Sequence, residues 1–231
     1  MASKKFITDL RFRDEIEKAT VFAIAGILKN WEAKISITDP SIPPGQLDQM
    51  DRELAAVLLL ALMQVFRSEA TALAGQLGLS TSNIEAESAE WARTKTAEVV
   101  KEFRKETLAR LQKAKLKQDL DNAAALALIL STQRAITLGS TYVTQAASAG
   151  EIRQRQRVSQ ELPQVEIQPD GTLKPVEKPF LRAIWNVRKD DRVCPKCSPL
   201  DGKDEDVWGP IYPDGPGTVH PRCRCFLTYK A

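Results

Sequence analysis

All four cysteines and the only histidine of this chain of 231 residues lie between Cys194 and Cys225. Thiolate and imidazole groups are the ligands that zinc prefers, so the part of the chain before Cys194 offers no site of that kind. The chain therefore divides into a long part without such ligands and a short C-terminal part that holds all of them.

The long part shows the three-and-four spacing of apolar residues that is typical of amphipathic helices. One stripe crosses residues 12–37, and a longer, more apolar one crosses residues 47–77. Ser82 and Glu85 have the spacing of a capping box and predict the start of a third helix. A fourth helix is expected over residues 123–149. The second stripe is long and apolar enough to form the central core helix.

The composition changes twice in the C-terminal third. Residues 151–180 alternate arginine with glutamine and then hold several prolines and an Asp-Gly turn signal, which is typical of a linker or an extended arm. Residues 181–188, and again residues 223–229, alternate in the period of a strand. Two short strands should therefore flank a loop rich in proline, glycine and aspartate.

These patterns predict a mainly α protein. The chain is 43% hydrophobic and long enough to bury a core in one medium domain and a small one. We expect a helical N-terminal domain over residues 1–150, a proline-containing arm over residues 151–180, and a small α+β Cys/His module of short antiparallel strands over residues 181–231.

Overall charge and hydropathy argue against two broad classes of protein. Lys and Arg number 33 against 30 Asp and Glu, a net charge of +3, so nucleic-acid binding through global charge is disfavoured. The longest uncharged apolar run, Leu54–Phe66, is shorter than the roughly 20 residues that cross a bilayer, so we expect no membrane span. Charges scattered through the first residues predict a protein made in the cytoplasm, without a cleaved export signal.

The cysteine spacing predicts a structural zinc site. Cys194 and Cys197 form a Cys-x-x-Cys turn, the usual first half of a tetrahedral site. The second half is either His220 with Cys223 or Cys223 with Cys225, which project the same way if they lie on a strand. A module of about fifty residues with few apolar side chains also needs a stabilising crosslink, and a bound metal commonly provides it in domains below roughly 70–80 residues.

Three other interpretations of the cluster stay open. Exposure to oxidising conditions would allow two disulfides. A redox-active Cys-Pro-Lys-Cys would need a thiolate at a helix N-terminus in a βαβ context, which the pattern does not indicate. The four cysteines would otherwise be reduced and serve as small apolar residues, with His220 holding a turn.

Catalysis finds little support in the residues. The single histidine belongs to the cysteine cluster, which leaves no Ser-His-Asp or Cys-His arrangement. The acidic run Asp201, Asp204, Glu205 and Asp206 is better interpreted as a solvated loop than as paired carboxylates. We therefore expect no enzyme and no small-molecule substrate.

Two basic clusters are candidates for contacts to DNA phosphates, which require no base-reading motif. The alternative is a solvated helix face with ion pairs between neighbouring turns. The candidates on the third helix and in the arm are Lys101, Arg104, Lys105, Arg153, Arg155 and Arg157.

The C-terminal motifs resemble a known signature. Trp185 stands first, Asp-x-Arg-x-Cys-x-x-Cys ends at Cys197, Leu-Asp-Gly occupies residues 200–202, and His-Pro-x-Cys-Arg-Cys ends at Cys225. In this order the motifs closely resemble the C-terminal signature of the phage Mu F-like minor head proteins, also called head morphogenesis proteins, of tailed bacteriophages.

The resemblance extends over about residues 120–231. It includes an arginine- and threonine-containing helix that begins near Arg134. In this helix the chain has Ser140 where the family usually has an arginine and Tyr142 where it usually has a glutamate.

The resemblance implies a structural protein of the virion, present in few copies at or near the portal vertex or in the head interior, after synthesis in the host cytoplasm. It implies that the partners are the portal protein or the major capsid protein, with packaged double-stranded DNA as a further candidate. The alternative is a zinc-supported module that binds DNA without sequence preference.

Overall fold

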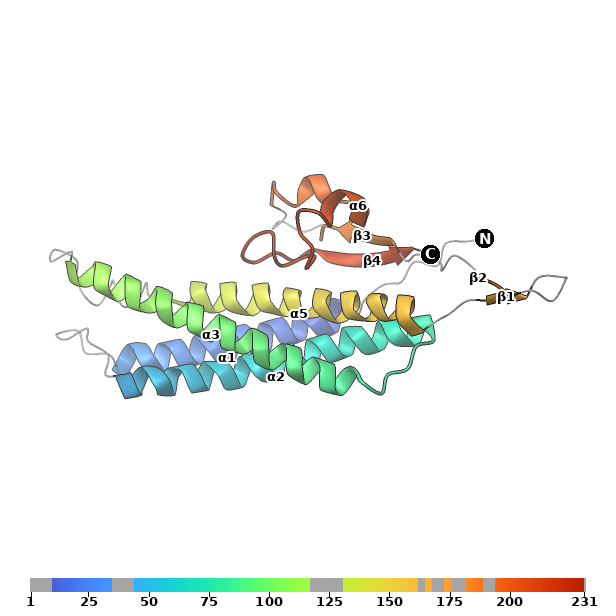
Figure 1. The fold of residues 1–231 in the computed structure, drawn as a ribbon. Helices are drawn as coiled ribbons and strands as arrows, with labels where there is room; N and C mark the ends of the chain where they lie inside the picture. The colour runs from blue at the N-terminus through green and yellow to red at the C-terminus, as the bar shows by residue number, and fades with distance from the viewer. Residues whose placement is uncertain are drawn as a thin grey trace.

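The computed structural model describes residues 10–34, 44–116, 131–161, 165–167, 173–175, 182–188 and 194–230. Long helices make up most of this structure, and a two-stranded antiparallel sheet lies near the C-terminus (Figure 1). The predicted mainly α fold class with a small α+β module is confirmed.

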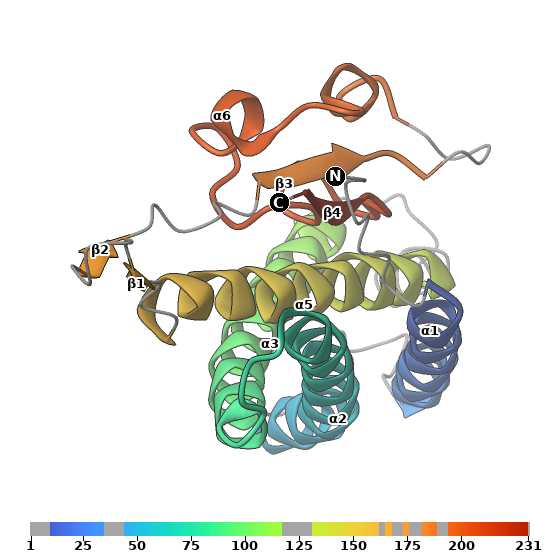
Figure 2. The ribbon, with the colours of Figure 1, turned by 90° about the vertical axis from the view of Figure 1, so that its right-hand side faces the viewer.

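Four long helices form the body of the molecule: α1 (Leu10–Lys34), α2 (Pro44–Leu77), α3 (Ile84–Leu116) and α5 (Thr132–Glu161). Consecutive helices run in alternate directions in Figure 1. In Figure 2, α1, α2 and α3 are seen nearly end-on, whereas α5 runs across them. Helix α5 thus packs against both α1 and α2 and offers its opposite side to the C-terminal module.

The core consists of two clusters of buried side chains. One lies among α1, α2, α3 and the start of α5 and contains Leu28, Trp31, Leu58 and Phe103. The other joins the second half of α2 and the middle of α5 to the C-terminal module. The predicted central helix is confirmed, because α2 contributes to both clusters.

The expected domain boundary at residue 150 is wrong, because α5 continues to Glu161. Arginine and glutamine are good helix formers, and the side chains of Glu151, Gln154 and Arg157 are buried. A regular burial pattern therefore continues through what the composition suggested was an arm. The start of the fourth helix expected over residues 123–130 lies outside the described residues.

Part of the expected arm is a small hairpin. Strand β1 (Val165–Ile167) pairs antiparallel with β2 (Leu173–Pro175). The Asp170-Gly171 turn signal lies between these strands, in a segment outside the described residues.

The C-terminal module is built on β3 (Arg182–Asn186) and β4 (Phe226–Lys230), with η1 (Ser198–Leu200) and α6 (Glu205–Trp208) between them. The strands pair antiparallel with Trp185 opposite Leu227. The predicted alternation is confirmed on β3, where Ala183 and Trp185 are buried. The prediction for the second strand was too long at its start, because Cys223 and Cys225 precede β4.

Helix α2 is long and apolar enough to cross a membrane by length and composition alone, over Gly45–Leu77. The core helix of a soluble protein passes the same test, and α2 packs here against α1, α3 and α5. The absence of a membrane span stays a prediction.

Candidate metal centre

A tight turn brings the first two cysteines together. The backbone N–H groups of Cys197 and Ser198 both donate to the Cys194 carbonyl, at 3.1 Å each, and the chain then enters η1. The sulfurs of both cysteines lie against one nitrogen of His220, Nε2, at 2.8 Å from Cys194 and 3.0 Å from Cys197. This turn has the form expected of the first half of a tetrahedral site.

A second turn presents His220 and the remaining cysteines. The Nδ1 atom of His220 lies 2.7 Å from the Pro221 carbonyl, to which Nδ1–H donates. Nε2 therefore carries the lone pair, as in metal-bound histidines whose other nitrogen is held by a backbone carbonyl. Arg222 adopts a left-handed backbone conformation (φ 64°), and Thr141 of α5 accepts a hydrogen bond from its N–H at 2.8 Å.

The five expected ligands are brought together in two groups that share Cys197. In the first, the donor atoms of Cys194, Cys197 and His220 lie within 4.8 Å of one another; in the second, those of Cys197, Cys223 and Cys225 do. The sulfurs of Cys197 and Cys223 are 3.9 Å apart. A tetrahedral ion with Zn–S bonds of about 2.3 Å separates its sulfurs by a similar distance. The cluster can hold a metal ion.

The three buried thiols ionise interdependently. Hydrogen bonds from the thiols of Cys197 and Cys225 lower the pKa of Cys223. The hydrogen bond to Cys223 raises the pKa of Cys197, and burial raises it further. A second thiolate beside the first therefore needs a cation to offset the repulsion, which is the role of a divalent metal in a thiolate cluster.

The geometry bears on the other interpretations of the cluster. All four cysteines are free thiols in this structure. Cys194 and Cys197 precede a 3-10 helix of three residues, not the N-terminus of a longer α-helix, so the setting that activates redox thiols is absent from the described turn.

The backbone of the second turn lies on a polar stripe of α5. Thr144 donates to the Cys223 carbonyl at 2.6 Å, Gln145 to Gly217 at 3.0 Å, and Ser148 to Pro216 at 3.1 Å. These residues were not among the predicted site residues. The available signal was their spacing of three and four, which places Thr141 and these side chains on one face.

A buried arginine of α1 also holds the ligand segment. Arg13 is 2% exposed and donates to the Cys225 carbonyl at 3.3 Å and to the Thr144 hydroxyl. Burial lowers the pKa of Arg13, against the opposing effect of Glu69 and other nearby carboxylates. Nothing in the local sequence distinguishes Arg13 from an exposed arginine, because its role depends on contacts with residues far along the chain.

Ion pairs fasten the module to the helices. Arg155 of α5 makes a bidentate pair with Glu205 of α6, and Arg188 makes one with Asp14 of α1. Asp201, a further member of the acidic run, accepts a hydrogen bond from the Val187 N–H at 2.8 Å. Asp201 is exposed, as predicted for a solvated loop, but it and Glu205 also have structural partners, which the prediction did not include.

The helix that resembles the family's arginine- and threonine-containing segment, α5, has a buried arginine in its first turn. The guanidinium carbon of Arg134 lies 4.0 Å from the centroid of the Phe103 ring, and Nη1 of Arg134 donates to the Thr107 hydroxyl at 2.9 Å. These contacts join α5 to α3. Burial lowers the pKa of Arg134 to about 10, so it stays charged at neutral pH. Ser140, at a position where the family usually has arginine, donates to Glu17 at 2.7 Å.

The proposed DNA-contact residues form two groups, on α3 and on α5. On α3, Arg104 pairs with Asp48 and Asp51, and Lys105 lies 3.4 Å from Glu102. On α5, the three arginines are engaged to different degrees. Arg155 pairs with Glu205, Arg157 is 6% exposed and donates to Gln154, and Arg153 lies 4.0 Å from Glu87. Lys101 is exposed.

Comparisons of the chain with protein-family models, with curated proteins and with solved structures find no match. The resemblance to phage minor head proteins therefore stays a prediction that rests on the C-terminal motifs.

Proposed function

We propose that this chain is a structural minor head protein of a tailed bacteriophage, an adaptor at or near the portal vertex. The observation that carries the proposal is that the signature residues serve to build and dock one small module. Trp185 is fully buried, and its ring centroid lies 5.5 Å from that of Trp208. Asp201 accepts a hydrogen bond from the Val187 N–H, and the Gly202 N–H donates to the Trp185 carbonyl. The second turn is held by α5 and α1.

We further propose that the ion is a structural Zn²⁺ held by Cys194, Cys197, His220 and Cys223. The contacts of both Cys-x-x-Cys sulfurs with His220 Nε2 support this set over four cysteines. Cys225 then acts as a thiol that donates to the Cys223 thiolate. Four protein ligands leave no open position for a catalytic water, which supports a structural role.

An adaptor needs surface that is not used within its own fold. Phe22 on α1 is 82% exposed and Ile211 in the module is 64% exposed. Large apolar side chains exposed to this degree are favourable anchors for a protein partner. Phe22 lies on the helices and Ile211 lies in the module. Each part of the molecule therefore offers an apolar anchor to a partner subunit.

The test is co-expression with the portal protein, and separately with the major capsid protein, of the phage genome that encodes this chain. Size-exclusion chromatography with light scattering should show a stable complex with one of them, and mass spectrometry should detect the chain in purified particles. Phe22→Ser tests the helical surface, with Glu15→Gln as a control at an exposed position of the same helix. Absence from particles and from both complexes would overturn the proposal.

The second candidate is a sequence-independent DNA-binding module. Lys105 and Arg110, which are 75% and 47% exposed, support it on α3. Because most of the candidate cations have carboxylate partners, we expect few phosphate contacts. The logarithm of affinity should then fall by about one unit per log of salt for each contact, with a total slope near 2 or below.

A further inference from the structure

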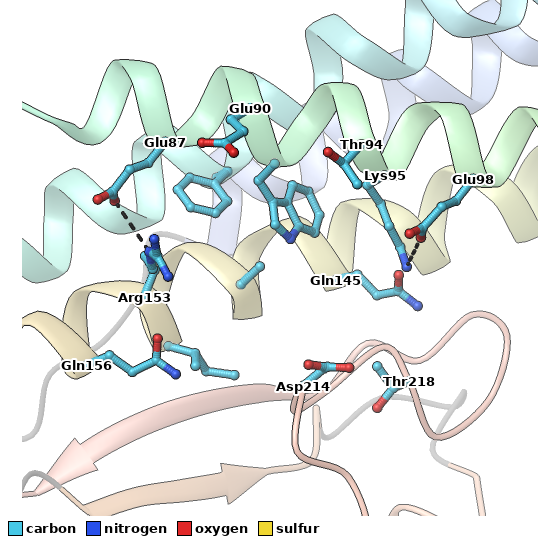
Figure 3. Close-up of a pocket in the computed structure, with 14 residues that line it drawn as sticks. Glu87, Glu90, Thr94, Lys95, Glu98, Gln145, Arg153, Gln156, Asp214 and Thr218 are labelled. Atoms are coloured by element: carbon cyan, nitrogen blue, oxygen red, sulfur yellow. Dashed lines mark hydrogen bonds and ion pairs between the residues drawn. The ribbon is translucent and has the colours of Figure 1, made fainter.

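A cavity of about 490 Å³ lies where α3, α5 and the loop at Asp214 and Thr218 meet (Figure 3). It is separate from the metal centre and takes no part in the proposed function. Its size is that of a ligand pocket. Because the module loop forms one side of the cavity, the cavity exists only when the module is docked on the helices.

One wall of the cavity is aromatic. Phe66 of α2 and Trp91 of α3 line it with ring centroids 5.5 Å apart. Trp91 is half-buried, so part of its ring surface is accessible. An indole face attracts a cation placed over it, and a planar guanidinium stacks on it.

The charges around the cavity are unbalanced. Four carboxylates line it against two cations. Lys95 lies 3.2 Å from Glu98, and Arg153 lies 4.0 Å from Glu87. The other two carboxylates, Glu90 on α3 and Asp214 on the module loop, form no ion pair with the described residues and lie on opposite sides of the cavity (Figure 3).

Oε1 of Gln145, a buried oxygen in the lining, also lacks a hydrogen-bond donor among the described residues. Oε2 of Glu87 is buried as well, and it forms the 4.0 Å ion pair with Arg153 without a hydrogen bond. The orientation of the Gln145 amide is fixed, because its Nε2 donates to the Gly217 carbonyl at 3.0 Å. A buried acceptor without a donor is unfavourable, and a bound N–H group would relieve it. The cavity therefore presents acceptors and negative charge, and it would repel a phosphate.

We infer that this cavity binds an arginine side chain from a protein partner, with the guanidinium against Trp91 and its charge attracted by the lining carboxylates that form no ion pair, Glu90 and Asp214. Arginine offers five N–H donors on a flat cation, which matches an aromatic wall, surplus carboxylates and unpaired acceptors. A lysine offers no flat surface to stack. The inference holds whichever protein the partner is, and it goes beyond the proposed function.

The test is an NMR titration of the full, zinc-loaded chain with N-acetyl-arginine amide, following the indole N–H signal of Trp91, which Trp91→Phe identifies. A saturable shift with a dissociation constant of about 1 mM is expected for a ligand of about 15 non-hydrogen atoms. The citrulline analogue has the same shape without the charge and should bind at least fivefold more weakly, as should the lysine analogue.

The variant Glu90→Gln with Asp214→Asn should weaken arginine binding about fivefold. The control, Glu15→Gln with Glu32→Gln on α1, changes net charge equally and should leave it within twofold. The absence of a saturable shift, equal binding of citrulline or lysine, or an equal effect of the control pair would each overturn the inference. The comparison of arginine with citrulline on the unmodified chain holds even if the double variant fails to fold.

Discussion

His220 and Cys225 are the two alternatives for the fourth ligand of the proposed metal site. Both are on the second turn, but only the ring nitrogen of His220 contacts both sulfurs of the first turn. Cys225 lies on the other side of Cys197, in the second group of donors. The two residues therefore allow a direct test of which one is the fourth ligand.

We predict that His220→Ala lowers zinc affinity more than 100-fold, because it removes a ligand. Cys225→Ala should cost about 10–100-fold, the effect typical of a group that hydrogen-bonds a ligand. Competition with a chromophoric chelator measures both affinities, and the absorption spectrum of the cobalt-substituted protein reports the number of sulfur ligands. The opposite ranking of the two variants would assign the site to four cysteines.

Asp14 illustrates how a single surface-like residue joins distant segments. The hydrogen bonds from Arg188 lower the pKa of Asp14, more than burial raises it. A depressed carboxylate pKa stabilises the fold above the unfolded pKa, near 3.9, and the stability is lost as the pH falls through the folded value.

We predict that Asp14→Asn destabilises the protein by about 1–2 kcal/mol at pH 7, because it removes a charge-assisted bidentate pair. The difference from the unmodified chain should shrink below about pH 4 as Asp14 itself takes up a proton. Urea unfolding at several pH values measures it. Glu15→Gln, next along α1 and exposed, should change stability by less than about 0.5 kcal/mol, and a loss that stayed constant with pH would contradict the prediction.

At the scale of elements, the contact between α5 and α2 depends on Gly150. A Cβ atom there would lie 2.5 Å from the Phe66 carbonyl oxygen, which is backbone and cannot rotate away. The two helices can cross this closely only because position 150 has no side chain.

Gly150→Ala should therefore destabilise the protein by about 1–3 kcal/mol through overpacking, although alanine is the better helix former. Gly26→Ala on α1 is the matched control, because nothing lies within 4 Å of its added Cβ. It should stabilise the protein by about 0.5–1 kcal/mol. Thermal unfolding distinguishes the two, and a stabilising Gly150→Ala would show that α5 shifts freely over α2.

The elements differ in how far the sequence predicts them. Apolar periodicity identified α2 and the alternation of β3, because both bury one regular face. It failed at the end of α5, where buried Gln154 and Arg157 occupy positions that a hydrophobic pattern assigns to solvent. The clustering of the cysteines and His220 was predictable from their spacing alone. Arg13 and Thr144 were not, because their function is to bond carbonyls more than 75 residues away.

For the whole molecule, the two core clusters suggest two levels of stability. The cluster among α1, α2, α3 and the start of α5 contains no residue of the module. The other cluster includes Trp185, Cys197 and Leu227 and depends on the module for much of its packing. A metal bound at the Cys/His cluster would therefore support the second cluster directly and the first only at a distance.

We predict that chelation of the metal releases the module and leaves the helices folded. Without the ion, repulsion among the thiolates opens the second turn, and the carbonyls of Cys223 and Cys225 lose their positions opposite Thr144 and Arg13. Hydrogen exchange measured by mass spectrometry should then become faster in residues 194–230 and at the start of α1, while residues 47–58 of α2, whose buried side chains belong to the cluster without module residues, keep their protection. Cys194→Ser should give the same pattern without a chelator. Unchanged exchange in the module would contradict the prediction, because the metal would then have no structural role there. Simultaneous loss of protection in α2 would also contradict it, because the whole chain would then unfold as a single cooperative unit.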